Sequence, residues 1–431
     1  MTRNKWLASC GIALACAWAQ AWPSAAIAEP LTLKRTLELV EDESPTLDAG
    51  RAQTDAADDE ASAARQLPDP TLSFGVQNLP FTGDDRFSFN RDDMTMKTIG
   101  LSQEWVGRSK RQARADQARQ KGIAEMAQAG ADQLKARQQA AETWIALMLA
   151  QREEQLLNQQ HEMLMTLIAG TDADVAASRL PTGDAIAARQ DLVAHENEQV
   201  ELQARIQTLK AQLTQMTLVA DPDPVGEGPD FTVLPIDPVR LESLVASHAA
   251  VQAADAELRS AQANTAVSRA ERHPDWSTEL MFGQRDGDRS QMVSLMFSIP
   301  LPINRPARQD KVVAATHARE LAAAAMLEKA RRSALAEIRG MYVAWQSASE
   351  RLKRFDTSLV PLAKQQAELA DARYGAGTGT LKEALAAKRD RVQVERERLA
   401  ILNDLGRAWI GLVLLAPDGS HTTLETAETS K

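Results

Sequence analysis

Cysteine is nearly absent from this chain of 431 residues, and its two cysteines, Cys10 and Cys16, both lie near the start. We expect residues 1–28 to be a cleaved secretory signal peptide. Two basic residues precede an apolar run there, and an A-x-A cleavage site ends at Ala28. An uncleaved membrane anchor and a lipid-modified cysteine are the alternatives. A cleaved chain would hold no cysteine, which excludes a disulfide framework and a thiolate metal site.

Aromatic residues are also scarce, at 4% of the chain. Large globular cores use more of them, so we expect helices packed on helices with small residues at the contacts. After residue 30, no apolar run approaches the roughly 18 residues of a membrane-spanning helix. The net charge of −10 disfavours nucleic acid as a partner.

The sequence repeats itself with a period near 200 residues. DAIAARQD at 184–191 returns as EALAAKRD at 383–390, and Trp144 returns as Trp345. We therefore predict a tandem duplication of one structural unit. The predicted order is the signal peptide, 1–28, a first repeat, 31–218, a Pro- and Gly-rich linker, 219–236, a second repeat, 237–415, and a disordered tail, 416–431.

Each repeat follows one plan, a helix, then two strands, then two long helices. The first helices are expected at about 33–66 and 238–272, where proline is rare or absent. A helix over about 107–167 would be roughly 90 Å long, which suits a tube or rod better than a compact globule. We expect Pro361 to kink or break the long helix that contains it.

Apolar stripes with heptad spacing predict that the long helices pack on one another as coiled coils. They are Leu202, Ile206, Leu209, Leu213 and Met216; Ile145, Leu149, Leu156, Met163 and Leu167; and Leu385, Val392, Leu399, Leu402, Trp409 and Val413.

The segment PDPTLSFGVQNLP at 68–80 alternates between apolar and small or polar residues, which indicates a strand with one apolar face. Three further segments alternate in the same way. The predicted strands cover about 71–80, 94–105, 276–284 and 289–299. Their predicted lipid-facing side chains are Leu72, Phe74, Val76, Leu280, Phe282, Val293, Leu295 and Phe297.

Strands of this length match tilted membrane β-strands. Four strands do not close a barrel, and an open sheet edge is not tolerated in lipid. The strands would therefore have to be shared among several protomers. The soluble alternative is a small sheet that packs on the helices.

The signal peptide and the duplicated layout resemble the TolC-type outer membrane efflux proteins over nearly the whole mature chain. LPDPTLSFGVQNLP and FSFNRDDMTMKTIGLSQEW further resemble the heavy-metal, CzcC-like branch of that family. The resemblance implies a mainly α fold with a small β part. Three protomers would pool their strands into a twelve-stranded β-barrel in outer membrane lipid, above a long periplasmic α-helical barrel.

The same resemblance implies a passive exit duct for heavy-metal cations, located in the outer membrane of a Gram-negative cell. Its expected partners are a periplasmic adaptor (membrane fusion) protein and an inner-membrane RND pump, with no cofactor. A duct for drugs or for type I protein secretion remains an alternative. A soluble periplasmic coiled-coil scaffold is the alternative from another class. We find no catalytic constellation, so no enzyme is expected.

Two helix–helix turns carry the family's tip motif, in YGAGTGTLKEAL (374–385) and SRLPTGDA (178–185). The resemblance implies that they lie at the periplasmic end, where the tube closes and the adaptor docks. Many relatives carry arginine where this chain has Gly379. Acids at helix N-termini also favour the helix dipole without any gating role. The gate candidates are Asp184, Glu383 and Tyr374, and the docking candidates are Arg179, Leu180, Gly377 and Gly379.

Other polar and sulfur-containing residues have ordinary interpretations beside functional ones. The histidines at 161, 195, 248, 273, 317 and 421 show no metal-ligand spacing, and we predict no metal site. The acids of the expected extracellular loop either collect cations or are simply solvated. Methionines near the strands either contact soft metals or fill space. These residues are Asp84, Asp85, Asp92, Asp93, Met94, Met96, Met292 and Met296.

Overall fold

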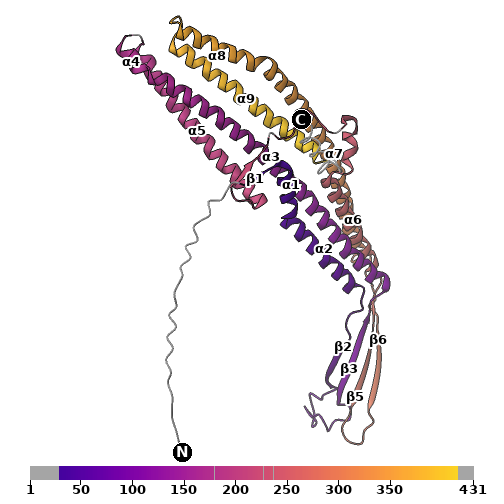
Figure 1. Ribbon diagram of the computed structural model, residues 1–431. Coiled ribbons are helices and arrows are strands. Elements are labelled where there is room, and N and C mark those ends of the chain that lie inside the picture. Colours follow the sequence, from indigo (N-terminus) through magenta and orange to yellow (C-terminus); the bar gives the residue numbers. More distant parts are fainter. Residues whose placement is uncertain (1–28, 179, 227, 236, 416–431) are drawn as a thin grey trace, which may run out of the picture.

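The computed structural model is elongated, with long helices at one end and a sheet at the other (Figure 1). The expected signal peptide, 1–28, and the expected tail, 416–431, lie outside the part of the chain that the structure describes. Within that part, no helix is both long enough and apolar enough to cross a membrane. The described residues are 29–178, 180–226, 228–235 and 237–415.

The two halves of the described chain contain the same order of elements, with shorter helices first, then two strands, then long helices. The first half forms α1 (Leu33–Asp42), α2 (Pro45–Ala64), β2 (Thr71–Gln77), β3 (Met96–Trp105), α3 (Arg108–Ala169), α4 (Thr171–Ala176) and α5 (Thr182–Thr217). The second half forms η1 (Pro238–Val245), α6 (Ala249–Ala270), β5 (Trp276–Gln284), β6 (Met292–Ser298), α7 (Gln309–Arg354), η2 (Phe355–Leu359), α8 (Val360–Gly375) and α9 (Leu381–Val413).

The first helix of each half is broken, so the prediction of single helices over 33–66 and 238–272 was wrong. Ser44 ends the first segment by capping the next one, where its hydroxyl accepts a hydrogen bond from Leu47 N at 3.3 Å. Pro45 follows at the start of α2, a position that needs no N–H donor. In the second half, His248 Nδ1 caps α6 by accepting from Ala250 N at 3.2 Å.

Helix α3 runs without a break for 62 residues, which corresponds to about 93 Å. It lies between α2 and α6 (Figure 1). Small residues allow the close approach of α2. A Cβ placed on Gly122 would lie 2.6 Å from Ala57 Cβ, and one on Gly50 would lie 2.8 Å from Ala129 Cβ. The expected small-residue contacts between helices are therefore confirmed.

The long helix that contains Pro361 changes its geometry just before the proline. A π-helical turn, η2, separates α7 from α8, and Pro361 is the second residue of α8. Proline lacks an N–H donor, and its ring clashes with the carbonyl one turn earlier. A widened turn accommodates both effects, so the expected disruption takes the form of a π-bulge.

The helical end has a core formed by the predicted apolar stripes. Leu202, Ile206 and Leu213 of α5 are buried there with Ile145 of α3 and Trp409 of α9. The predicted coiled-coil seams are thus confirmed at their centres.

Equivalent tryptophans bind the chain segment that precedes the helices of each half. Trp144 Nε1 donates to Leu31 O at 2.7 Å, and Trp345 Nε1 donates to Phe231 O at 2.9 Å. Leu31 belongs to β1 (Glu29–Leu31), which pairs in parallel with β4 (Pro222–Pro224). Each half therefore starts from a main-chain carbonyl held by the indole of its own long helix.

The sheet has the strand order β2-β3-β5-β6, and each neighbouring pair is antiparallel. The four predicted strands are confirmed, although β2, β3 and β6 are shorter than expected. β2 ends at Gln77 because Asn78 takes a positive φ of 57°, which leaves the strand conformation. β6 begins only at Met292, after a loop that interacts with the loop of the first half.

Candidate functional site

One face of the four-stranded sheet is apolar and open to its surroundings. Exposed fractions run from 43% for Phe282 to 83% for Phe74. The face therefore does not pack on the helices, contrary to what the soluble alternative expects. All the side chains predicted to face lipid are exposed, namely Leu72, Phe74, Val76, Leu280, Phe282, Val293, Leu295 and Phe297.

The strand register arranges these side chains in two rows that cross the whole sheet. The sequence did not single out Ile99 and Leu101, because the alternation of β3 is weak. Pairing with the clearer strands on both sides places them on the apolar face. The rows are Leu72, Leu101, Leu280 and Leu295, and Phe74, Ile99, Phe282 and Val293. A continuous apolar surface of this kind is typical of a membrane or protein contact.

The opposite face of the sheet carries small and polar residues together with methionines. Met96, Met292 and Met296 lie on this side by strand alternation, whereas Met94 precedes β3 in the loop. Met96 covers Gly283, where a Cβ would lie 3.0 Å from Met96 Sδ. Met96 thus packs over a small neighbour, and Met292 accepts a 3.7 Å hydrogen bond from Arg285 through its sulfur.

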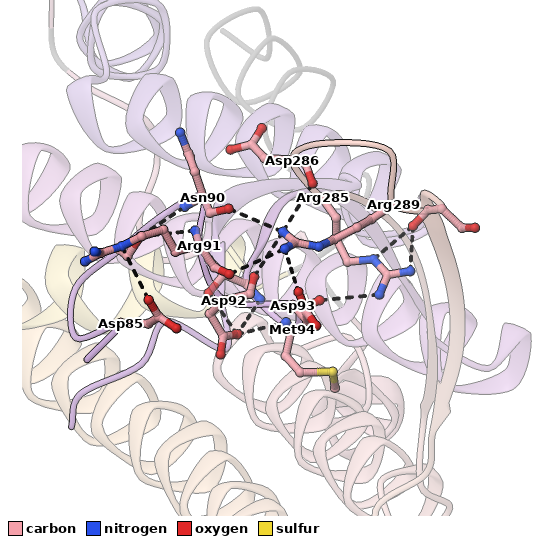
Figure 2. Close-up of polar contacts among 12 residues, drawn as sticks. Asp85, Asn90, Arg91, Asp92, Asp93, Met94, Arg285, Asp286 and Arg289 are labelled. Atoms are coloured by element: carbon pink, nitrogen blue, oxygen red, sulfur yellow. Dashed lines mark hydrogen bonds and ion pairs between the residues drawn. The ribbon is translucent and has the colours of Figure 1, made fainter. Parts of the chain in front are cut away.

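Three of the four aspartates of the loop between β2 and β3, namely Asp85, Asp92 and Asp93, have basic or main-chain partners for their carboxylates (Figure 2). Arg91 lies 3.4 Å from Asp85, and Arg289 lies 2.5 Å from Asp93. Asp92 Oδ1 accepts from the main-chain N–H of Met94 at 2.8 Å. Such pairing lowers the negative charge that these carboxylates offer to a passing cation, so the geometry favours a structural role.

Arg289 also joins the loops of the two halves (Figure 2). Its guanidinium donates to the carbonyls of Asn90 at 3.3 Å and Arg91 at 3.4 Å, both in the first loop. Arg285 adds a bond to Asp93 O at 3.4 Å. The short β5–β6 hairpin therefore holds the longer β2–β3 loop in place.

The turn between α8 and α9 is tight and depends on glycine. Arg373 O accepts hydrogen bonds from Thr378 N at 2.9 Å and Gly379 N at 3.0 Å. Gly377 has a φ of +72°, which favours glycine. A Cβ on Gly379 would lie 3.1 Å from Arg373 Cβ, so a larger residue there would need a shift of this turn.

Glu383 has a defined structural partner at the start of α9. Its carboxylate accepts from Thr380 N at 3.1 Å, while Thr380 Oγ1 accepts from Glu383 N at 3.2 Å. This reciprocal pair is a capping box, which satisfies main-chain donors at the helix N-terminus. Asp184 lies in the first turn of α5, after an N-terminal residue, Pro181, that makes no side-chain cap.

The two predicted tips lie together. Leu180 of the first turn packs in one apolar cluster with Leu381 and Leu385 of α9 and with Leu164 of α3, and Tyr374 packs against its edge. Arg179 lies outside the described residues. The structure thus brings the tip motifs of both halves to the same end of the molecule, opposite the sheet (Figure 1).

Ion pairs flank the two turns in equivalent positions. Arg189 pairs with Asp172 across the first turn, and Lys388 pairs with Asp371 across the second at 2.6 Å. Asp371 follows Asp172 by 199 residues, and Lys388 follows Arg189 by the same number. This spacing also relates Asp184 to Glu383. The duplication therefore extends to the contacts that close each helical hairpin.

Two histidines that are distant in sequence lie together, which their spacing did not indicate. The rings of His161 and His195 stack with centroids 5.9 Å apart, and His195 Nε2 lies 2.8 Å from Leu157 O. His421 lies outside the described residues. In the described ranges, no group of three or more His, Cys, Asp or Glu side chains is arranged to hold a metal ion.

Comparison with known proteins agrees with this architecture. Residues 241–416 match the family described as outer membrane efflux protein. The second half of the chain thus carries an outer membrane efflux protein domain, and the resemblance found in the sequence is confirmed.

The cobalt-zinc-cadmium resistance protein CzcC of Cupriavidus metallidurans is 26% identical over 280 residues. The alignment covers 64% of this chain and 64% of that relative, less than two thirds of its length.

Solved structures share the fold of nearly the whole chain. The outer membrane channel CmeC of Campylobacter jejuni superposes with a TM-score of 0.75 at 15% identity, over 89% of this chain and 85% of CmeC. CusC, whose structures concern folding and transmembrane channel formation, gives a TM-score of 0.76 at 15% identity, over 89% of this chain and 92% of CusC. At these identities the likeness establishes the fold alone.

Replacing Arg289 with alanine should loosen the β2–β3 loop, because that side chain bonds to several of its main-chain carbonyls. Exposed ion pairs contribute about 0.2–1 kcal/mol each, so a combined loss near 1 kcal/mol would raise amide exchange roughly fivefold. Hydrogen-exchange mass spectrometry of residues 84–95 measures it. Arg86→Ala is the control, because that guanidinium lies only over the ring of Phe87. Equal exchange in both variants would contradict the proposed role of Arg289.

Proposed function

We propose that this chain is the outer membrane channel of a tripartite efflux system, acting as a passive exit duct for heavy-metal cations. The observation that carries the proposal is the exposed apolar face of a sheet attached to long helices. A face of this kind is stable only against lipid or another apolar surface. Its central strands β3 and β5, with 10 and 9 residues, have the length of tilted membrane strands, and the outer membrane efflux protein domain supports the same assignment.

The proposed assembly is a homotrimer in the outer membrane of a Gram-negative cell. Pooling the strands of three copies would give a twelve-stranded barrel without open edges, which lipid requires. The polar face of each sheet would then line the exit path, and the helices would extend into the periplasm. The fold shared with CmeC and CusC supports this arrangement.

The proposed cargo rests on the metal-resistance relative, and the proposed partners rest on the resemblance to the efflux family. Similarity to a cobalt-zinc-cadmium resistance protein favours divalent heavy-metal cations over drugs or secreted proteins. A passive duct needs an energy source elsewhere, which an inner-membrane RND pump joined by a periplasmic adaptor would supply. In the proposed assembly, Leu180, Gly377 and Gly379 belong to the adaptor-docking turns, together with Arg179.

Growth of a deletion strain tests the function and names the cargo. We expect sensitivity to one or a few of copper, silver, zinc, cadmium, cobalt and nickel, with unchanged tolerance of a hydrophobic dye. Dye sensitivity alone would move the duct to multidrug efflux. A chain recovered as a soluble periplasmic monomer would instead support a coiled-coil scaffold and overturn the channel.

Replacing Phe282 with arginine should reduce the yield of assembled trimer in the outer membrane. A charge on the lipid side of a membrane strand costs about 2–4 kcal/mol near the midplane. Met281→Arg is the matched control, because this neighbour lies on the polar face beside Gly100 and Ser294. Membrane fractions analysed by native mass spectrometry measure the yield. Normal assembly of Phe282→Arg would show that this face does not meet lipid.

The charge of Glu383 is proposed to act at the periplasmic constriction, with Asp184 and Tyr374 nearby on the same tip. Like charges from several copies, brought close in a narrow opening, attract cations and repel one another. Glutamine retains the capping box but removes the charge. Glu383→Gln should therefore reduce cation preference in single-channel recordings while leaving the melting temperature unchanged.

Glu368→Gln is the control for that measurement, because this exposed acid lies earlier on α8 and outside the tip cluster. If both variants conduct like the parent channel, Glu383 serves the helix cap alone.

A further inference from the structure

The sheet has two outer strands, β2 and β6, with no strand beside their outer edges in the described ranges. Both strands carry large exposed apolar side chains, such as Phe74 at 83% and Val293 at 70%. Edge N–H and C=O groups form a template for another strand. The question is which strand fits, and in which register.

The two hairpins of the sheet are copies of each other. Thr71 pairs with Ser102 in the first hairpin, and Ser277 pairs with Ser298 in the second. Thr71 and Ser277 are 206 residues apart, the same spacing that separates the Pro-Asp dipeptides before β2 and β5. Their partners Ser102 of β3 and Ser298 of β6 are 196 residues apart.

Within the chain, the second strand of one hairpin pairs with the first strand of the next. This is the β3–β5 contact, in which Leu101 lies opposite Leu280 and Ile99 opposite Phe282. If the contact repeats, β6 meets β2 of a second copy. A head-to-tail contact that uses different surfaces on each side can continue until a ring closes.

We propose that β6 pairs with β2 of a second copy of this chain in the register given by this internal repeat. Phe297 then lies opposite Phe74 of the second copy, and Leu295 lies opposite Val76. On the polar face, Ser298 lies opposite Ser73. The inference rests on the proposed trimeric channel and specifies its subunit contact.

The side-chain pattern supports this register, although it played no part in deriving it. Leu295 and Phe297 of β6 meet apolar residues of β2, Ser294 meets Gln77, and Met296 meets Gly75. Val293 lies opposite Asn78, just past the end of β2. A slip of one residue would turn one whole set to the wrong face. The apolar face of the sheet would then continue from copy to copy through the Leu295–Val76 and Phe297–Phe74 contacts.

A buried ion pair provides a second, independent match. Lys110 Nζ lies 2.5 Å from Asp275 Oδ2 and donates to His273 O at 2.9 Å, with only 7% of the lysine side chain exposed. Lys110 is the third residue of α3, and Lys311 is the third residue of α7. Their spacing of 201 residues equals that of Trp144 and Trp345 on the same two helices.

The counterpart of Asp275 is Asp69, which precedes β2 and is exposed, as is Lys311. The internal repeat therefore places Lys311 beside Asp69 of the second copy. Opposite charges at this position would fix both the partner and its register.

The helices show the same incomplete contact. α3 packs between α2 of its own half and α6 of the next half, whereas α7 packs on α6 of its own half and, in the described chain, has no helix from a following half beside it. Val312, Leu321 and Met326 of α7 remain 49–60% exposed. In the proposed contact, α2 of the second copy lies along α7.

Cysteine pairs test the register directly. With both natural cysteines replaced by alanine or removed with the signal, the double variant Ser73→Cys/Ser298→Cys should form covalent multimers on mild oxidation in isolated outer membranes. The matched control is Ser73→Cys/Ser294→Cys, on the same face but four residues along, a shift of about 13 Å. Non-reducing electrophoresis should show multimers for the first pair and monomers for the second.

The outcomes separate the register from the function. The register is wrong if only the control pair forms covalent multimers. It is also wrong if neither pair forms them although native mass spectrometry finds trimers. In both cases the proposed channel function is unaffected. If the unmodified chain is itself monomeric in membranes, the proposed function fails.

Charge reversal tests the ion pair. Asp69→Lys and Lys311→Asp should each lower the temperature at which the trimer dissociates, and the double variant should restore it. Circular dichroism of each variant confirms that the helices remain folded. If neither single reversal lowers the dissociation temperature, or if the double variant dissociates below both, Asp69 and Lys311 do not meet.

Discussion

Two groups of atoms in the sheet require different solvents. The outer edges of β2 and β6 expose hydrogen-bonding main-chain groups, which water satisfies and lipid does not. The same strands expose rows of leucine and phenylalanine, which lipid accommodates and water does not. A single protomer therefore has no environment that suits both. The proposed pairing of the edges with further copies would resolve the conflict, and the rest of the molecule is compatible with it.

The helical part, away from the sheet, shows the same internal duplication. Each half begins at a carbonyl held by an indole, at Trp144 and Trp345, and ends in a hairpin closed by an equivalent ion pair. α3 is continuous between these points, whereas its counterpart is interrupted by the π-turn before Pro361. The halves are thus similar at their ends and differ in between.

Charged residues at both ends have structural partners as well as possible functional ones. In the loops, arginines from the second half neutralise or bond to the aspartate-rich segment of the first half, so these acids are less available to cations than the sequence suggested. At the tip, the carboxylate of Glu383 completes a capping box. A gating role of Glu383 would come in addition to this cap. The two roles can be distinguished because gating needs the negative charge, whereas the cap needs only the hydrogen bonds.

Much of this molecule follows from patterns of short range. The alternation around Phe74 and the heptad stripes determined the strands, the long helices and their apolar faces, because periods of two and of about 3.5 residues report local geometry. The duplication that relates Trp144 to Trp345 was also recognisable in the sequence. The helix breaks at Ser44 and His248 were missed, because a single capping residue is a weak signal within a segment whose other residues favour a helix.

What the tertiary structure decided is which residues meet across long separations. The register placed Ile99 and Leu101 in the apolar rows, and folding brought Arg289 to the loop that holds Asp93, nearly 200 residues away. It also stacked His161 on His195 and joined Leu180 to Leu381. No periodicity encodes such pairs, because they depend on how helices and strands from the two halves pack against each other in space.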